Sequence, residues 1–236
     1  MSFILKKLSP AKINLFLEVK NKREDGYHNI ESLMTFCNYG DFLKIKKSDK
    51  FCLKLDGPFG VDLENKNNLI EKAKYKLEHL YKKKFDVEVI LTKNLPIASG
   101  MAGGSSNAAT FIKCIKEIYD LKDVLGFDDL LLSLGSDVPF CYHGKTALVR
   151  GIGEKLNFIN IKENYYLLLI NPKIEISTQK IFNELRELKK NRLDNLLINL
   201  KETVKFDFFS TRENHLQDYA ISQSEEIKEI LLLMYS

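Results

Sequence analysis

The chain has 236 residues, which at about 150 residues per domain corresponds to one large domain or two small ones. Hydrophobic residues make up 44% of it and charged residues 29%, which excludes a disordered or fibrous protein and predicts a packed globular one. The formal net charge of +4 is too small to indicate nucleic-acid binding, although a mildly basic cleft for a small anionic ligand fits it.

The longest segment without a charged residue, 94–112, contains Pro96, three glycines and several hydroxyl groups. Its length would span a bilayer, but this composition is not that of a transmembrane helix. The N-terminus carries lysines after only a few apolar residues and has no small-residue cleavage site, so no secretory signal is expected. We therefore expect a cytoplasmic protein without membrane contact.

Four cysteines lie far apart in the chain, without a Cys-x-x-Cys pair or paired histidines: Cys37, Cys52, Cys114 and Cys141. This spacing indicates neither a zinc site nor an extracellular disulfide framework. All four are expected to be buried, reduced thiols.

The first quarter of the chain is predicted to form strands over 13–19, 29–36, 42–45 and 51–55. Residues 67–84 then change to the helical period, and Asn68 is the expected N-cap, with Asn67 as its competitor. The lysine run 82–84 suits the C-terminal end of this helix, where cations interact favourably with the helix dipole.

Residues 85–91 alternate as in a strand, 96–104 form a glycine-containing loop, and a helical pattern follows through Ile118. A helix is expected over 128–134, a break at 135–139 and a strand over 146–150. Beyond a boundary near 151–155, we expect a strand over 165–170 and mostly helix from Thr178 onward.

The loop between strand and helix is where backbone amides and a helix dipole hold a phosphate. It is neither a Walker loop, since no Gly-Lys-Ser or Gly-Lys-Thr follows, nor a Gly-x-Gly-x-x-Gly dinucleotide loop. The alternative is an ordinary tight connection with Ser105 or Ser106 as helix N-cap.

Four motifs in order resemble the GHMP small-molecule kinases, over about residues 9–182. Residues 9–15 (SPAKINL) resemble the first motif and residues 96–109 the second. Residues 25–28 (DGYH) and 134–139 (LGSDVP) are most similar to the branch that phosphorylates 4-diphosphocytidyl-2-C-methyl-D-erythritol.

The resemblance implies an α+β, two-domain GHMP kinase fold. Residues 1–154 would form the N-terminal ATP-binding domain, of the ribosomal protein S5 domain 2-like type, and 155–236 a ferredoxin-like C-terminal domain. Family members continue to a third glycine-rich motif beyond the segment that resembles 213–234, so the second domain is expected to be incomplete in this chain.

The resemblance makes Asp137 the base that accepts the substrate hydroxyl proton, and Lys12 the group that orients it and steadies the developing charge. Alternation places Lys12 and Asn14 on one face of their strand. The alternatives are a helix-capping or turn role for Asp137 and an exposed position on an edge strand for Lys12.

ATP is the implied cofactor and Mg²⁺ would accompany it, although no carboxylate can be named as a metal ligand. The resemblance assigns ATP contacts to Asn68 and to the loop residues Pro96, Ile97, Ala98, Ser99, Gly100, Met101, Ala102, Gly103, Gly104, Ser105 and Ser106. Ala98, Ser99 and Ala102 stand where the family commonly has glycine, and Met101 replaces its leucine. Alanine disfavours positive φ, so these differences put details of the loop in question.

The implied partner is a small cytidine diphosphate substrate, whose 2-hydroxyl would be phosphorylated in the non-mevalonate isoprenoid route. Alternatives are another GHMP kinase acting on homoserine, mevalonate or a sugar, and a catalytically silent nucleotide-binding homologue. A monomer or a homodimer is expected. The resemblance assigns the substrate to Asn14, Tyr27, His28, Thr178 and Phe182.

Overall fold

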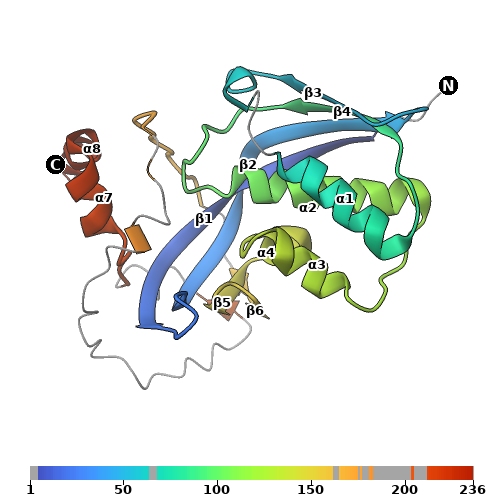
Figure 1. Ribbon diagram of the computed structural model, residues 1–236. Helices are drawn as coiled ribbons and strands as arrows, with labels where there is room; N and C mark the ends of the chain where they lie inside the picture. The colour runs from blue at the N-terminus through green and yellow to red at the C-terminus, as the bar shows by residue number, and fades with distance from the viewer. Residues whose placement is uncertain are drawn as a thin grey trace. The chain divides into compact units, whose positions relative to one another are not determined.

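The computed structural model describes residues 5–63, 68–161, 165–174, 176, 181–182, 203–204 and 212–235. The chain forms two compact units: unit 1 is Met1–Lys12 with Phe36–Gly144, and unit 2 is Ile13–Thr35 with Lys145–Ser236. Two long paired strands, β1 (Leu5–Lys22) and β2 (His28–Lys47), contribute residues to both units (Figure 1). The domain boundary after residue 154 stays a prediction.

The sheet of unit 1 is built around β4 (Val87–Thr92). This strand pairs antiparallel with β2, where Phe42 lies opposite Thr92, and parallel with β3 (Cys52–Asp56). Its alternation is that of a half-buried strand, because Val87, Val89 and Leu91 are fully buried and the residues between them are not.

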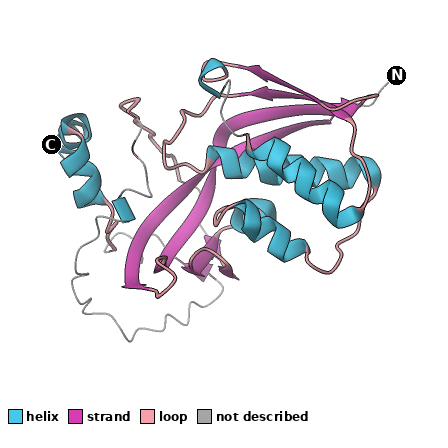
Figure 2. Cartoon of the chain, in the orientation of Figure 1, coloured by secondary structure: helices cyan, strands magenta, loops and turns pink. Residues whose placement is uncertain are grey.

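Helices cover this sheet in unit 1 (Figure 2). They are α1 (Leu69–Tyr81), α2 (Gly103–Tyr119), α3 (Phe127–Leu134) and α4 (Val138–His143), with the 3-10 turn η1 (Val61–Leu63) after β3. Helix α1 packs against α2 and α3, while α2 and α3 pack against α4. The apolar stripe of α1, with Ile70, Ala73 and Leu77, is buried as its spacing predicts.

One predicted interruption is wrong. The segments 29–36 and 42–45 belong to the single strand β2, which runs through Gly40. A Cβ at Gly40 would overlap the Ser9 carbonyl oxygen, so the glycine permits a close backbone approach and does not end the strand. The break predicted at 135–139 is confirmed over 135–137, between the end of α3 and the start of α4, whose first turn holds Pro139 at a position that proline tolerates.

In unit 2, residues 30–34 of β2 pair antiparallel with β5 (Ala147–Gly151), which pairs with β6 (Lys155–Phe158). A two-stranded parallel pair, β7 (Asn160–Ile161) with β8 (Thr203–Val204), and the helices α7 (Gln217–Gln223) and α8 (Glu225–Tyr235) follow. The core of this unit groups four buried side chains: Phe16, Leu33, Leu148 and Ile159.

Buried charges in unit 2 are paired. Glu18 accepts hydrogen bonds from Lys20 at 2.8 Å and from Arg212 at 2.7 Å, and Glu31 accepts one from Arg150 at 2.6 Å. Burial opposes ionisation of Glu18, but these two hydrogen bonds outweigh it and hold the pKa of its carboxyl below the usual range. The acid therefore stays charged inside the unit.

The strand predicted over 165–170 is wrong, since the structure assigns these residues no strand. Tyr166 and Leu168 are exposed, so the apolar run is not paired into a sheet that would bury it. All four cysteines are free, but only Cys114 and Cys141 are buried; Cys37 and Cys52 are half-buried. Among the described helices, none combines the length and the apolar character needed to cross a bilayer.

Candidate active site

The glycine loop of unit 1 ends at Ala102, the residue before α2 begins and three residues before Ser105. Ala102 is the N-cap residue and makes no side-chain capping hydrogen bond, so the alternative in which Ser105 or Ser106 caps this helix does not hold. The backbone amides of a helix's first turn have no partner within the helix, and the helix dipole adds positive potential there. The start of α2, with Gly103 and Gly104, therefore fits a phosphate group.

Left-handed backbone shapes this loop. Ala98 has φ 52°, Gly100 φ 74° and Ala102 φ 51°. The two alanines thus occupy the positive φ values that alanine disfavours, at a cost of roughly 1–2 kcal/mol each. The loop therefore keeps a left-handed backbone at two positions where it carries alanine.

The N-terminus of α1 lies beside the start of α2. The Asn68 side-chain oxygen accepts a hydrogen bond from the Ile70 amide at 2.9 Å, which confirms the predicted N-cap. A Cβ on Gly104 would lie 3.4 Å from Leu69 Cδ1, so the two helix starts are adjacent. The structure therefore brings Asn68 close to the glycine loop.

Lys12 and Asp137 come together in the same unit. Lys12 Nζ lies 3.4 Å from Asp137 Oδ2, and their side chains are 7% and 29% exposed. Lys12 is therefore not an exposed edge-strand lysine. Asp137 stands at the N-cap of α4 but makes no side-chain capping hydrogen bond, which leaves its carboxylate to the Lys12 ammonium.

Two contacts connect this pair to the glycine loop. The Lys12 amide donates to the Met101 carbonyl oxygen at 3.0 Å. On the other side, a Cβ on Gly135 would lie 3.9 Å from Ser105 Oγ, so the turn before Asp137 borders the first turn of α2. A buried cation, a partly exposed carboxylate and unpaired helix amides therefore converge.

Cys141 lies close to the same pair but is not a nucleophile. Burial is the main cause that holds the pKa of its thiol far above the usual range, and the negative charge of Asp137 acts in the same direction. The thiolate is the reactive form of cysteine, so this thiol stays inert at neutral pH.

The predicted substrate residues that the structure describes lie in unit 2, and they differ in burial. The His28 ring is stacked on Phe182, with 5.5 Å between the ring centroids, and His28 is only 8% exposed. Tyr27 is 60% exposed at the end of a turn in which its amide donates to Asp25 Oδ1 at 3.2 Å. Asn14 Oδ1 accepts from Ser32 Oγ at 3.3 Å. Thr178 lies outside the described residues.

His28 is held in its neutral form. Burial lowers the pKa of its imidazole, and the positive charge of Lys22 adds to the effect. A neutral imidazole has one ring nitrogen that donates and one that accepts hydrogen bonds. Together with the Phe182 face, it can stack on a flat heterocycle and read its edge.

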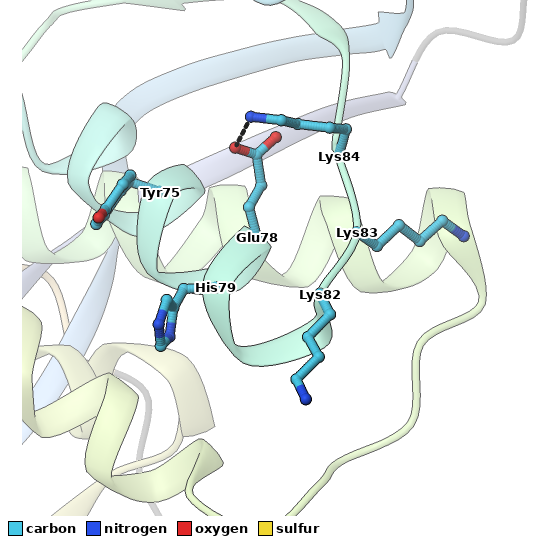
Figure 3. Close-up of a pocket in the computed structure, with 6 residues that line it drawn as sticks. All are labelled: Tyr75, Glu78, His79, Lys82, Lys83 and Lys84. Atoms are coloured by element: carbon cyan, nitrogen blue, oxygen red, sulfur yellow. Dashed lines mark hydrogen bonds and ion pairs between the residues drawn. The ribbon is translucent and has the colours of Figure 1, made fainter.

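A separate shallow hollow of about 300 Å³ lies at the C-terminal end of α1 (Figure 3). It is lined by Tyr75, Glu78, His79, Lys82, Lys83 and Lys84. The lysines follow the helix end as predicted: Lys82 is the C-cap, and its amide donates to the Glu78 carbonyl oxygen. No lining residue belongs to the Lys12–Asp137 pair or to the glycine loop, so this hollow is not the candidate active site.

The sequence interpretation missed a buried ion pair below the loop, between Asp41 and Lys93. Lys93 Nζ lies 2.6 Å from Asp41 Oδ2, and both side chains are almost fully buried. The signal was present in the alternation of β4, because Lys93 takes the next inward position after Val89 and Leu91.

The start of α2 fits a nucleotide phosphate, because Gly103 and Gly104 carry no side chain there and the amides of the first turn can donate hydrogen bonds. Among the described residues, no three His, Cys, Asp or Glu side chains group together to hold a metal ion.

Residues 68–145 match the family described as GHMP kinases N terminal domain. The 4-diphosphocytidyl-2-C-methyl-D-erythritol kinase of Wigglesworthia glossinidia brevipalpis is 42% identical over 85% of this chain and 67% of the relative. The enzyme of that name from Buchnera aphidicola subsp. Schizaphis graminum (strain Sg) is 38% identical over 96% of this chain and 77% of the relative.

The chain belongs to the 4-diphosphocytidyl-2-C-methyl-D-erythritol kinase family. A crystal structure of 4-(cytidine 5'-diphospho)-2C-methyl-D-erythritol kinase matches the present structure with a TM-score of 0.70. The match has 26% sequence identity and covers 96% of this chain and 81% of that chain. The chain is therefore a small-molecule kinase with the α+β GHMP fold, and a kinase of this family uses ATP.

Proposed function

We propose that the chain transfers the γ-phosphoryl group of ATP to the 2-hydroxyl of 4-diphosphocytidyl-2-C-methyl-D-erythritol. The observation that carries this proposal is the Lys12–Asp137 pair, 3.4 Å apart and connected to the glycine loop through the Lys12 amide. Phosphoryl transfer depends on a positioned hydroxyl, a proton acceptor and neutralised charge, and these groups supply the last two.

Asp137 is the proton acceptor in this proposal. Its partly exposed carboxylate takes the proton of the attacking hydroxyl, whose oxygen forms the new bond to phosphorus. Lys12 holds the carboxylate in place, and its buried ammonium stabilises the charge that develops during transfer. ATP supplies the phosphoryl group, and ADP leaves.

The first turn of α2 and the loop 96–106 hold the phosphates. Gly103 and Gly104 let the backbone amides approach phosphate oxygens, and Asn68 meets the nucleotide from the start of α1. Mg²⁺ would be held mainly by phosphate oxygens and water, as is usual for this ion in kinases, since no protein cage is present among the described residues.

The cytosine base is assigned to unit 2. His28 offers one donor and one acceptor at the edge of the ring, and Phe182 provides an aromatic face at 5.5 Å from it. Stacking against an aromatic side chain and hydrogen bonding to the base edge are how proteins recognise single bases. Tyr27, Asn14 and Thr178 complete the proposed substrate contacts.

Two other functions compete with this one. A kinase for mevalonate, homoserine or a sugar would not need the neutral His28 beside Phe182. A catalytically silent homologue would not need the Lys12–Asp137 pair, which contributes a buried charge that is costly to keep.

The test is a phosphotransfer assay with purified protein, ATP and Mg²⁺. The acceptors are 4-diphosphocytidyl-2-C-methyl-D-erythritol, mevalonate, homoserine and galactose, each at the same concentration. We expect ADP release and a phosphorylated product only with the cytidylyl acceptor. Selective turnover of another acceptor would replace the proposed substrate, and ATP binding without any transfer would favour the silent homologue.

A further inference from the structure

We infer that Asp41 and Lys93 form a positioning pair that holds the phosphate loop in shape and sets the affinity for the phosphates of ATP. The inference rests on the proposed function, which places ATP at this loop. It concerns two residues that do not touch the reacting atoms, and it follows from the contacts of the pair with the strand before the loop and the helix after it.

Asp41 fixes the chain where it leaves β4. Its Oδ1 accepts hydrogen bonds from the amides of Asn94 at 2.7 Å and Leu95 at 2.8 Å, and its Oδ2 accepts one from Lys93 Nζ at 2.6 Å. The Asn94 side chain also donates to the Gly40 carbonyl oxygen at 2.9 Å. The residues immediately before the loop are therefore tied to β2 by one buried carboxylate.

Lys93 reaches from the strand to the start of α2. A Cβ built on Gly103 would lie 3.0 Å from Lys93 Nζ and 3.6 Å from Asp41 Oδ2. Gly103 is thus seated directly against the ion pair, and the absence of its side chain makes room for the ammonium. One pair of side chains contacts both ends of the loop.

The ammonium also contributes charge. It lies behind the first turn of α2, where the helix dipole is already positive, and its side chain is only 4% exposed. In this low-dielectric surrounding, the positive charge acts on a nearby anion more strongly than it would in water. Asp41 offsets part of this charge and stabilises the ammonium against burial, which lowers the pKa of Lys93.

Stability alone does not account for such a pair. A buried ion pair often contributes little to folding compared with apolar side chains of similar volume, because both charges lose their hydration. A role in shaping the loop and its potential gives the pair a function that apolar residues could not supply.

The chain contains a matched control pair on α1. Glu78 Oε1 accepts hydrogen bonds from Lys74 Nζ at 2.7 Å and from the Phe85 amide at 2.8 Å. This pair has the same chemistry as Asp41 with Lys93, a carboxylate that accepts from a lysine and from a backbone amide. It lies on a different element and does not contact the loop.

The experiment compares ATP and adenosine, which differ by the phosphates alone. Calorimetric Kd values are measured for the wild type, Lys93→Met, the charge-neutral double variant Lys93→Met with Asp41→Asn, and the control Glu78→Gln. The double variant removes the buried unpaired carboxylate that could prevent Lys93→Met from folding. All proteins are measured below their thermal unfolding transitions.

We expect the double variant to weaken ATP by about tenfold or more and adenosine by less than about twofold. Glu78→Gln should lower the thermal midpoint while leaving both Kd values unchanged. An unchanged ATP Kd in the double variant, or equal losses of ATP and adenosine, would overturn the inference. Failure of the wild type to bind ATP would instead overturn the proposed function, and this inference with it.

Discussion

Asp137 is the residue on which the proposed chemistry depends most directly. Asp137→Asn keeps the size of the side chain and an oxygen for Lys12, but the amide cannot accept the hydroxyl proton. We expect kcat to fall by ~10²–10⁴-fold with little change in the Kd of ATP, because a positioned base typically contributes that factor. Steady-state kinetics and calorimetry measure the two quantities.

Asp129, an exposed residue of α3, provides the matched control for that substitution. Asp129→Asn should turn over at the wild-type rate. If Asp137→Asn also retained near-wild-type kcat, Asp137 would not be the base, and the proton would have to leave by another group.

His28 allows a prediction of pH dependence. Its pKa is lowered by burial, so the unfolded chain binds a proton more readily than the folded one once the pH falls below the ordinary histidine value of about 6.5. The free energy of unfolding is therefore independent of this group above pH ~6.5 and decreases as the pH falls below that value. His28→Gln should flatten this part of the pH profile of the thermal midpoint.

The second cause of the His28 shift can be tested separately. Lys22→Met removes a nearby positive charge but leaves the burial of the imidazole in place. The acid decline should then shrink only in part. A pH profile identical in wild type and His28→Gln would show that His28 does not carry the effect.

Among the secondary-structure elements, the segment formed by β4, the glycine loop and α2 shows what sequence patterns can and cannot predict. Alternation located β4, and the helical period located α2, because both periods are set by which side chains are buried. Serine is a preferred N-cap, so the sequence alone left a cap at Ser105 or Ser106 open, whereas the structure uses Ala102 in a left-handed conformation. No local pattern reveals a positive φ at alanine.

Ala102→Gly tests the strain at that position. Glycine adopts a φ of 51° freely, so the roughly 1–2 kcal/mol cost of the left-handed alanine disappears. Glycine also raises the conformational entropy of the unfolded chain by about 0.4–1 kcal/mol, which offsets part of the stabilisation from the released strain. We expect the free energy of unfolding to rise by about 0.5–1 kcal/mol in chemical denaturation.

Ala108→Gly supplies the opposite control within the same helix. Ala108 lies in the buried interior of α2, where glycine costs about 1 kcal/mol in helix propensity. This variant should be less stable than the wild type. A loss of stability in Ala102→Gly as well would mean that the left-handed alanine carries no strain.

For the whole molecule, the α+β fold was predictable and the arrangement of the site was predictable in part. The resemblance placed Lys12 and Asp137 in one site, and their 3.4 Å separation fits that prediction. The Asp41–Lys93 pair was not named, since its members are distant in sequence and the alternation that turns Lys93 inward does not reveal its partner. The boundaries of the two compact units depend on contacts, which one sequence does not display.

We expect ATP to bind unit 1 and CDP to bind unit 2, and amide hydrogen exchange can locate each ligand. ATP should slow exchange at the start of α2 and of α1, where Gly103 and Asn68 lie, because a ligand that binds only the folded state opposes opening. CDP should slow exchange around His28 and Phe182. At a ligand concentration of 100 times Kd, amides that exchange through opening of the bound site should slow by about a hundredfold, whereas amides that exchange through global unfolding slow with either ligand and are left out of the comparison. Adenosine serves as the control, since it lacks the phosphates and should protect the start of α2 less than ATP does. Protection of the α2 start by CDP, or of His28 by ATP, would reverse the assignment of the two ligands and with it the roles proposed for both sets of residues.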